Sequence, residues 1–238
     1  MIVCRKFVYI HTSRHAGTFI NKLLLEYVPD TKMLRYHGQL SDLPAQYSEL
    51  PVLGFVRNPW DWYVSMYFNY KKKKQYVFEI VSEQGSLGFE ATIERFANLG
   101  DGSSTSTALL TELQRVAPER MGPHVPPGLR NPGLRKANFQ NYPAGLGYYS
   151  WLVRQMHEVQ GTLNGVFGRF EKLRSDLPEL LRQTGTPITP EMSEYIEAKE
   201  RLNSSSREDC YRRYFSESLA DLVGQRDRYI TKRFDYTF

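Results

Sequence analysis

The sequence predicts an α/β domain with a central parallel sheet flanked by helices. Three short runs, at 6–11, 51–56 and 165–170, are rich in β-branched and aromatic residues and have the composition of buried strands. Each run is followed by a polar or glycine-containing turn and then by a helical pattern. The length of 238 residues suits one such domain. We therefore predict a single domain over residues 1–238, with ligand sites at the carboxyl ends of its strands.

Helical patterns connect and follow these strands. Pro59 suits the first turn of the helix after the second strand, and Asn58 is placed to cap it. The lysines at 71–74 are expected to form the solvated end of that helix, where cations are favourable. We expect helices at 19–25, 60–70, 90–98, 148–157, 173–183, 191–202 and, for the most part, 207–233.

The region 85–141 is the least regular part of the sequence. Apart from the helix at 90–98, it is dominated by segments at 100–106 and 121–143 that are rich in Gly, Pro, Ser and Asn. Irregular stretches of this length in a compact domain are usually functional loops or disordered segments. We expect 85–141 to be a variable region that forms an acceptor site or a lid.

Composition excludes some classes of protein and leaves others open. No apolar run approaches the roughly 20 residues of a membrane span, and the first residues show no cleavable signal, so we expect a cytoplasmic protein. The two cysteines have no metal-ligand spacing, and we expect no metal. The net charge of +5 favours a polyanionic ligand, which could be a nucleotide, an acidic acceptor or nucleic acid.

The loop 12–18 is the first candidate site. A loop between a strand and the N-terminus of a helix directs backbone N–H groups outward, and the helix dipole adds positive potential. Arg14 adds a cation with forked donors, Gly17 permits close approach of the backbone, and Thr18 offers a hydroxyl. An ordinary β–α turn with a surface arginine remains open as an interpretation. The loop lacks the Gly-Lys-Ser/Thr of a Walker A motif, so no machinery for hydrolysing ATP is visible.

The second candidate site begins at the end of the strand 51–56. Arg57 follows that strand directly, and Ser65 lies further along the next helix. An arginine and a hydroxyl placed in this way can hold one phosphate together. Taken alone, each residue also has an ordinary interpretation: Arg57 as a surface arginine, and Ser65 as a serine on a helix.

These two motifs resemble those of the sulfotransferases that use 3′-phosphoadenosine 5′-phosphosulfate (PAPS). Arg-Asn-Pro-Trp-Asp-x-x-x-Ser-x-Tyr, which starts at Arg57, is similar to the 3′-phosphate motif of that family, especially its carbohydrate-type branch and bacterial relatives. The loop 10–18 is similar to the family's 5′-phosphosulfate loop, often written H-x-P-K-x-A-G-T. The segments 170–177, 202–215 and 234–238 resemble later parts of the family, so the likeness covers about 6–65 and 145–238.

The resemblance implies a P-loop-like sulfotransferase fold, PAPS as donor and PAP as product, without a metal. It implies that Arg14 and the amides of the following residues hold the 5′-phosphosulfate, and that Arg57 and Ser65 hold the 3′-phosphate. The family often has lysine at position 14, and because arginine keeps its proton, Arg14 should act by electrostatics. The full set of implied donor-binding residues is Arg14, His15, Ala16, Gly17, Thr18, Phe19, Arg57, Ser65, Ser205 and Arg207.

An acceptor hydroxyl also needs a general base, and His37 is the first candidate. His37 is also compatible with an ordinary polar histidine in a loop, and His124 in the unmatched region or a glutamate remain open as the base. His11 and His15 are expected to support the phosphosulfate loop, and His157 is expected on a helix surface.

The aromatic residues around the second motif have two interpretations, core packing or contact with the acceptor or adenine, and core packing is the commoner role. They are Trp60, Trp62, Tyr63, Tyr67, Tyr148, Tyr149 and Trp151.

The sequence therefore favours transfer of a sulfuryl group to a hydroxyl or amine of a small-molecule or glycan acceptor, without nucleic acid or a membrane span. A PAP-binding protein without catalysis, a P-loop-type kinase and a basic nucleic-acid-binding protein are the alternatives. The acceptor and the oligomeric state cannot be read from the sequence.

Overall fold

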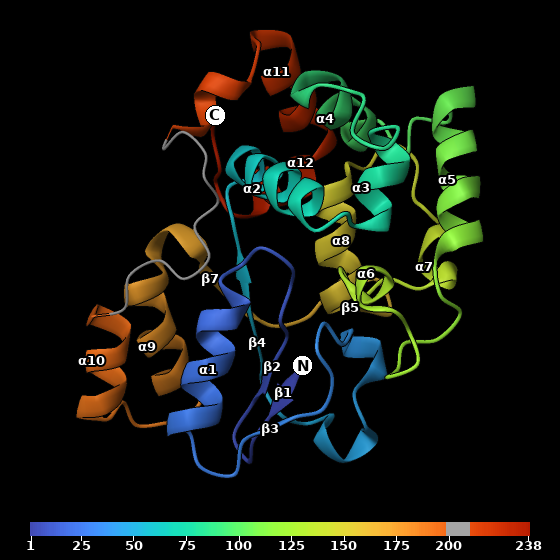
Figure 1. Ribbon diagram of the computed structural model, residues 1–238. Helices are drawn as coiled ribbons and strands as arrows, with labels where there is room; N and C mark the ends of the chain where they lie inside the picture. The colour runs from blue at the N-terminus through green and yellow to red at the C-terminus, as the bar shows by residue number, and fades with distance from the viewer. Residues whose placement is uncertain (199–209) are drawn as a thin grey trace. The chain divides into compact units, whose positions relative to one another are not determined.

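The computed structural model describes residues 1–198 and 210–238, which form two compact units (Figure 1). Within the described residues, the first unit contains 1–57 and 153–198, and the second contains 58–152 and 210–238. The single domain expected over residues 1–238 stays a prediction. The structure is α/β, with a mixed five-stranded sheet and flanking helices.

The sheet lies in the first unit, in the order β3-β1-β2-β4-β7. Its strands are β1 (Ile2–Val3), β2 (Val8–Tyr9), β3 (Lys32–Met33), β4 (Val52–Val56) and β7 (Val166–Arg169). β2, β4 and β7 pair in parallel, whereas β1 pairs antiparallel with both β2 and β3. The prediction of a parallel sheet is therefore right for the three strands that precede the candidate sites and wrong for the two others.

A tight turn explains the antiparallel edge. The N–H of Cys4 donates to the carbonyl of Phe7 at 3.1 Å, which reverses the chain between β1 and β2. A connection this short joins only antiparallel neighbours, because parallel strands need a long crossover. The sequence prediction began its first strand at residue 6 and missed β1, so it had no hairpin to place.

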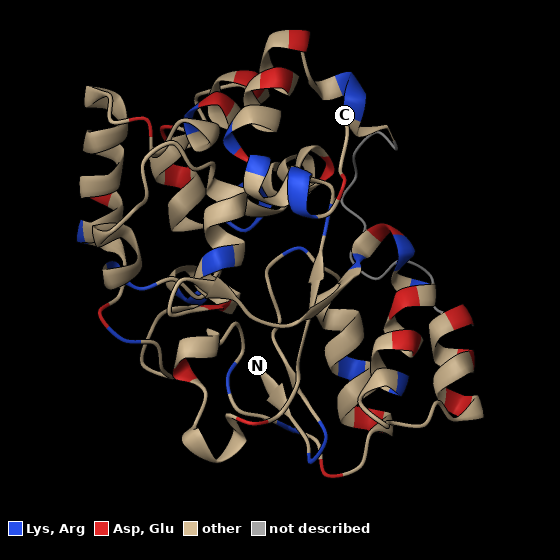
Figure 2. Ribbon diagram, turned by 180° about the vertical axis from the view of Figure 1, so that it is seen from behind, with Lys and Arg blue, Asp and Glu red and all other residues tan. Residues whose placement is uncertain are grey.

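Three helices pack on one face of the sheet and bury the main apolar cluster of the first unit. Figure 1 shows α1 (Gly17–Tyr27), α9 (Leu173–Gln183) and α10 (Pro190–Ala198) beside one another. Apolar side chains of α1 recur at three- and four-residue spacing and face the sheet, as an amphipathic helix requires. The outer sides of these helices carry residues of both charges (Figure 2). The buried cluster includes Phe7, Tyr9, Ile20, Leu23, Leu24, Leu53, Phe55, Leu177, Leu181 and Ile196.

Short elements complete the first unit. The sheet formed by β5 (Glu158–Val159) and β6 (Thr162–Leu163) is an antiparallel pair. The 3₁₀ turns are η1 (Leu40–Asp42), η2 (Ala45–Tyr47) and η3 (Phe170–Lys172). Helix α8 (Tyr148–His157) contributes its last residues, from Val153, to this unit and its first residues to the other.

The second unit is helical in the residues that the structure describes. Its elements, besides the start of α8, are α2 (Pro59–Lys72), α3 (Tyr76–Val81), α4 (Phe89–Ala97), α5 (Ser104–Val116), α6 (Pro127–Arg130), α7 (Lys136–Gln140), η4 (Tyr211–Tyr214), α11 (Glu217–Arg226) and α12 (Arg228–Arg233). Nowhere in 1–198 or 210–238 does a helix combine the length and apolar character needed to cross a bilayer.

Helix α2 begins as the sequence predicts. The side chain of Asn58 accepts hydrogen bonds from the backbone N–H groups of Trp60 and Asp61 at 3.0 and 3.2 Å, and Pro59 occupies the first turn. The lysines at 71–74 are exposed at its other end, as expected. The seven aromatic residues considered above are all buried, which supports their interpretation as core. Trp62, for example, stacks on Tyr149 at a centroid distance of 4.6 Å.

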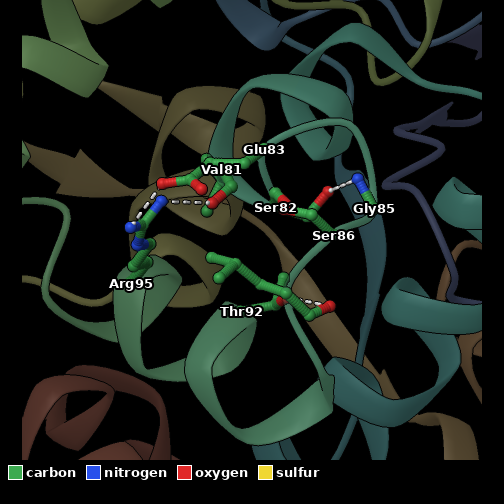
Figure 3. Close-up of polar contacts among 8 residues, drawn as sticks. Val81, Ser82, Glu83, Gly85, Ser86, Thr92 and Arg95 are labelled. Carbon is green, nitrogen blue, oxygen red and sulfur yellow. Dashed lines mark hydrogen bonds and ion pairs between the residues drawn. The ribbon is translucent and has the colours of Figure 1, made fainter.

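The region 85–141 is more regular than predicted. It contains α4, α5, α6 and α7, so its interpretation as a long irregular stretch is wrong. Ser103 caps α5 by accepting from the N–H of Ser106, and this signal was available in the sequence. The turn before α4 is held by local contacts (Figure 3): Ser82 Oγ accepts from the Gly85 N–H at 2.9 Å, and Arg95 pairs with Glu83 at 2.7 Å.

A buried carboxylate connects three helices of the second unit. Asp227 is inaccessible to solvent and accepts hydrogen bonds from Tyr63 Oη at 2.8 Å and from the Ser150 N–H at 2.7 Å. Burial disfavours the charged form and raises the pKa of Asp227 to about 6, although both hydrogen bonds oppose this. The folded chain therefore binds a proton at Asp227 more tightly than the unfolded chain does.

We predict that this carboxylate makes the stability of the chain fall as pH rises. Between about pH 4 and pH 7 the folded state gives up a proton that the unfolded state has already lost, so the free energy of unfolding drops by about 2–3 kcal/mol. Replacing Asp227→Asn removes this contribution. Urea unfolding at several pH values should show the difference between wild type and variant changing by that amount, in favour of the variant at high pH. Asp221→Asn, an exposed change on α11, is the control, and a pH-independent difference for Asp227→Asn would contradict the prediction.

Candidate active site

The candidate site lies at the carboxyl ends of three parallel strands of the first unit. The chain continues from β2 into the loop 12–18, from β4 into Arg57 and from β7 into Phe170. The register pairs Val56 with Arg169, so Arg57 and Phe170 leave the sheet side by side. Ligand sites of open α/β sheets form at this edge.

The loop 12–18 has an unusual backbone. Arg14 and Ala16 both have positive φ, 69° and 56°, a conformation that costs about 1–2 kcal/mol for a residue with a side chain. Ala16 is the N-cap of α1 and provides no side-chain cap, and the first turn of α1 contains no acidic residue. The first amides of α1, at Gly17, Thr18 and Phe19, have no acceptor within the helix and retain the positive end of its dipole. This arrangement suits an anion.

Arg57 links two of the strand ends. Its Nη1 donates to the backbone carbonyl of Arg14 at 3.0 Å, and its Cζ lies 4.0 Å from the ring centroid of Phe170. The side chain is buried, with 4% exposure. A guanidinium fixed by a carbonyl on one edge and an aromatic ring on one face has few rotamers left, so its remaining donors are pre-oriented.

Three buried histidines surround the loop in their neutral form. Burial lowers the pKa of His15 to about 3, with a further contribution from the charge of Arg57, and burial also lowers the pKa of His157 to about 3. The pKa of His11 lies well below its usual value because of burial and the neighbouring His37. At neutral pH these imidazoles therefore carry no charge, and the positive charge of the loop comes from Arg14 and Arg57.

His37 is held in a defined tautomer. Its Nδ1 lies 3.0 Å from the carbonyl oxygen of His11, and because a carbonyl can only accept, Nδ1 carries the proton. Neutral His37 therefore has its lone pair on Nε2. Its ring packs against His11, with 4.3 Å between centroids, and its backbone has a φ of 52°.

The structure brings some of the predicted site residues together and leaves others apart. Arg14 to Phe19, Arg57 and His37 belong to the first unit, where Thr18 is exposed and Arg14 half-buried. Ser65 is buried in α2, in the second unit, so its role beside Arg57 stays a prediction. His124 is exposed in the second unit. Ser205 and Arg207 lie outside the described residues.

Two residues of the site, His157 and Phe170, were misjudged or missed from the sequence. The expectation that His157 lies on a helix surface is wrong: it is fully buried, and its Nε2 lies 3.0 Å from Thr12 Oγ1. Gly54, in the middle of β4, leaves space for the His157 ring, because a Cβ at this position would lie 2.5 Å from that ring. A glycine inside a strand is the sequence signal of such a close approach. Phe170 carried no comparable signal.

Comparisons with known proteins returned no relative. No family model, no curated protein and no solved structure matches the chain significantly. The resemblance to sulfotransferases therefore rests on the two motifs and the supporting segments of the sequence.

We predict that Gly17 is required for the shape of the loop. A Cβ at this position would lie 1.8 Å from the ring of His11, so Gly17→Ala must displace that ring or the start of α1, at a cost of about 2–3 kcal/mol. Ala16→Gly is the matched variant one residue away. It relieves a positive φ and should leave stability unchanged or raise it by up to about 1 kcal/mol. Thermal and urea unfolding of both variants check this, and equal effects of the two changes would contradict it.

Proposed function

We propose that the protein is a sulfotransferase that moves a sulfuryl group from PAPS to a hydroxyl or amine of an acceptor. The observation that carries this proposal is the convergence of Arg57 and the loop 12–18, joined by the hydrogen bond from Arg57 to the Arg14 carbonyl. In the motifs that this chain resembles, these two segments hold the two ends of one nucleotide.

Transfer of this kind depends mainly on charge and position. The acceptor oxygen or nitrogen forms a bond to sulfur while the bond from sulfur to the bridging phosphate oxygen breaks, and that electron pair remains on the phosphate. The first amides of α1 and the guanidinium of Arg14 are proposed to stabilise this charge. The buried histidines at the loop are neutral, so they add no charge to that of the arginines and the helix dipole.

His37 is proposed as the base that takes the acceptor's proton. The hydrogen bond from its Nδ1 to the His11 carbonyl orients the ring and leaves Nε2 as the proton acceptor. This is the arrangement by which a second group fixes the tautomer of a catalytic histidine. Arg57, with Ser65 as a second ligand, is proposed to bind the 3′-phosphate.

We predict that PAP binds with micromolar affinity, ATP binds weakly, and Arg57→Ala weakens PAP binding about a hundredfold, or by about 2.7 kcal/mol. Arg57→Lys keeps the charge but not the fork, and should show an intermediate loss. Calorimetric titration measures all three. Arg5→Ala is the control, because Arg5 is a highly exposed cation paired with Asp30. Equal binding of PAP and ATP, or equal effects of the Arg5 and Arg57 changes, would overturn the donor site.

We predict that His37→Asn strongly slows transfer without changing PAP affinity. Asparagine tolerates a positive φ, and its amide can donate to the His11 carbonyl as the imidazole does, so the change removes little except the base. The rate of PAP release from PAPS, in a mixture of phenols, sugars and amines, should fall by about 10²–10⁴-fold. If the rate is retained in His37→Asn but lost in His124→Asn, the base is His124 instead.

A further inference from the structure

An open pocket of about 410 Å³ adjoins the loop 12–18 in the first unit. One wall is the outer face of α1, from Thr18 to Glu26, and the other is the segment that follows it. The lining residues are Thr18, Asn21, Lys22, Leu25, Glu26, Met33 and Tyr36. Its volume lies in the range of small-molecule sites, about 300–1,000 Å³.

The pocket is unusually apolar for a surface. Leu25, Met33 and Tyr36 line it with 44%, 38% and 51% of their surface exposed, and Leu34, in the same segment, is also exposed. These four account for most of the large hydrophobic residues that the described chain leaves exposed. A cluster of this kind marks a binding site rather than scattered surface.

The charges at the pocket offset one another. Lys22 and Glu26 lie one turn apart on α1, with Nζ and Oε2 separated by 3.9 Å. A site for a polyanionic glycan would carry an excess of cations, whereas this one has a balanced pair. The lining therefore suits an uncharged body with an apolar surface.

A buried polar atom at the pocket lacks a partner. Asn21 is 6% exposed; its Nδ2 lies 3.1 Å from His11 Nδ1, and its Oδ1 has no hydrogen-bond partner. A buried amide oxygen without a donor is rare and costly, so Asn21 marks this wall of the pocket as polar and incompletely hydrogen-bonded.

One residue that lines the pocket, Tyr36, contacts the proposed base. The ring of Tyr36 contacts the rings of His37 and His11, with centroid distances of 4.5 and 4.9 Å. Tyr36 thus connects the pocket to His37, and Thr18 connects it to the loop proposed to hold the phosphosulfate.

We propose that this pocket binds the acceptor, and that the acceptor is a small uncharged alcohol with an aromatic or alkyl body. The identification as acceptor rests on the proposed function. Its hydroxyl oxygen forms the new bond to sulfur, its proton passes to His37 Nε2, and the bridging phosphate oxygen of PAPS leaves with the electron pair, which gives a sulfate ester and PAP.

The test uses 2-naphthol, 1-octanol and the neutral disaccharide cellobiose as probes, titrated into the full-length protein with and without PAP. We expect 2-naphthol and 1-octanol to bind and cellobiose not to bind at the same concentration. Leu25→Asp and Met33→Asp, both at exposed positions, should weaken binding of 2-naphthol at least tenfold while PAP affinity changes less than twofold. Val159→Asp is the matched control, because Val159 is equally exposed but lies outside the pocket, and it should change neither.

The two proposals fail in different ways. If PAP binds and neither alcohol does, or if Leu25→Asp and Met33→Asp bind 2-naphthol like the wild type, the pocket is not the acceptor site, and the donor site stands. Stronger binding of cellobiose than of either alcohol also overturns the pocket's assignment. If 2-naphthol binds with the expected sensitivity to Leu25→Asp while PAP does not bind, the pocket stands as an alcohol site, and the sulfotransferase proposal falls.

Discussion

The stacking of Arg57 on Phe170 depends on one structural constraint, the parallel register of β4 and β7. Because Val56 pairs with Arg169, the residues that follow them, Arg57 and Phe170, are neighbours. A shift of the register by one residue would separate the guanidinium from the ring. From that position Arg57 reaches the carbonyl of Arg14, so the same register also connects the loop after β2. A buried cation is tolerated here because a carbonyl and an aromatic face replace part of its hydration.

The imidazoles near Arg57 are uncharged at neutral pH. Burial keeps His11, His15 and His157 neutral, and each has a distinct hydrogen-bond partner, namely Asn21, the Ser13 carbonyl and Thr12. Histidines of this kind act as rigid polar spacers that support a loop whose backbone is strained at two residues. The electrostatic character of the loop is thereby left to its arginines and to the helix dipole.

Local signals determined which parts of the fold could be predicted. Helix α2, with its Asn58 cap, and helices α8 and α9 were found from the sequence because caps and periodicity are encoded within a few residues. The short strand β1 was missed because two residues show no periodicity. The antiparallel edge of the sheet was therefore not predicted. In the site, the resemblance implied that Arg14 and Arg57 hold the two ends of one nucleotide, and that role stays a prediction; the structure shows that the Arg57 side chain contacts the backbone of Arg14. The contact of Phe170 depends on tertiary register, which no local pattern records, and the position of His157 was indicated only by Gly54 inside its strand.

The pairing of Thr12 with His157 spans 145 residues, and this separation affects how the protein is made. During synthesis the loop emerges early, together with β1, β2 and α1, but His157, β7 and Phe170 follow only after residues 58–152 of the second unit. Contacts of such long range form late and slow the folding of a chain. A nascent chain that ends before His157 has the loop sequence without His157 or Phe170, so we expect ligand binding by this loop only after β7 and Phe170 have been synthesised.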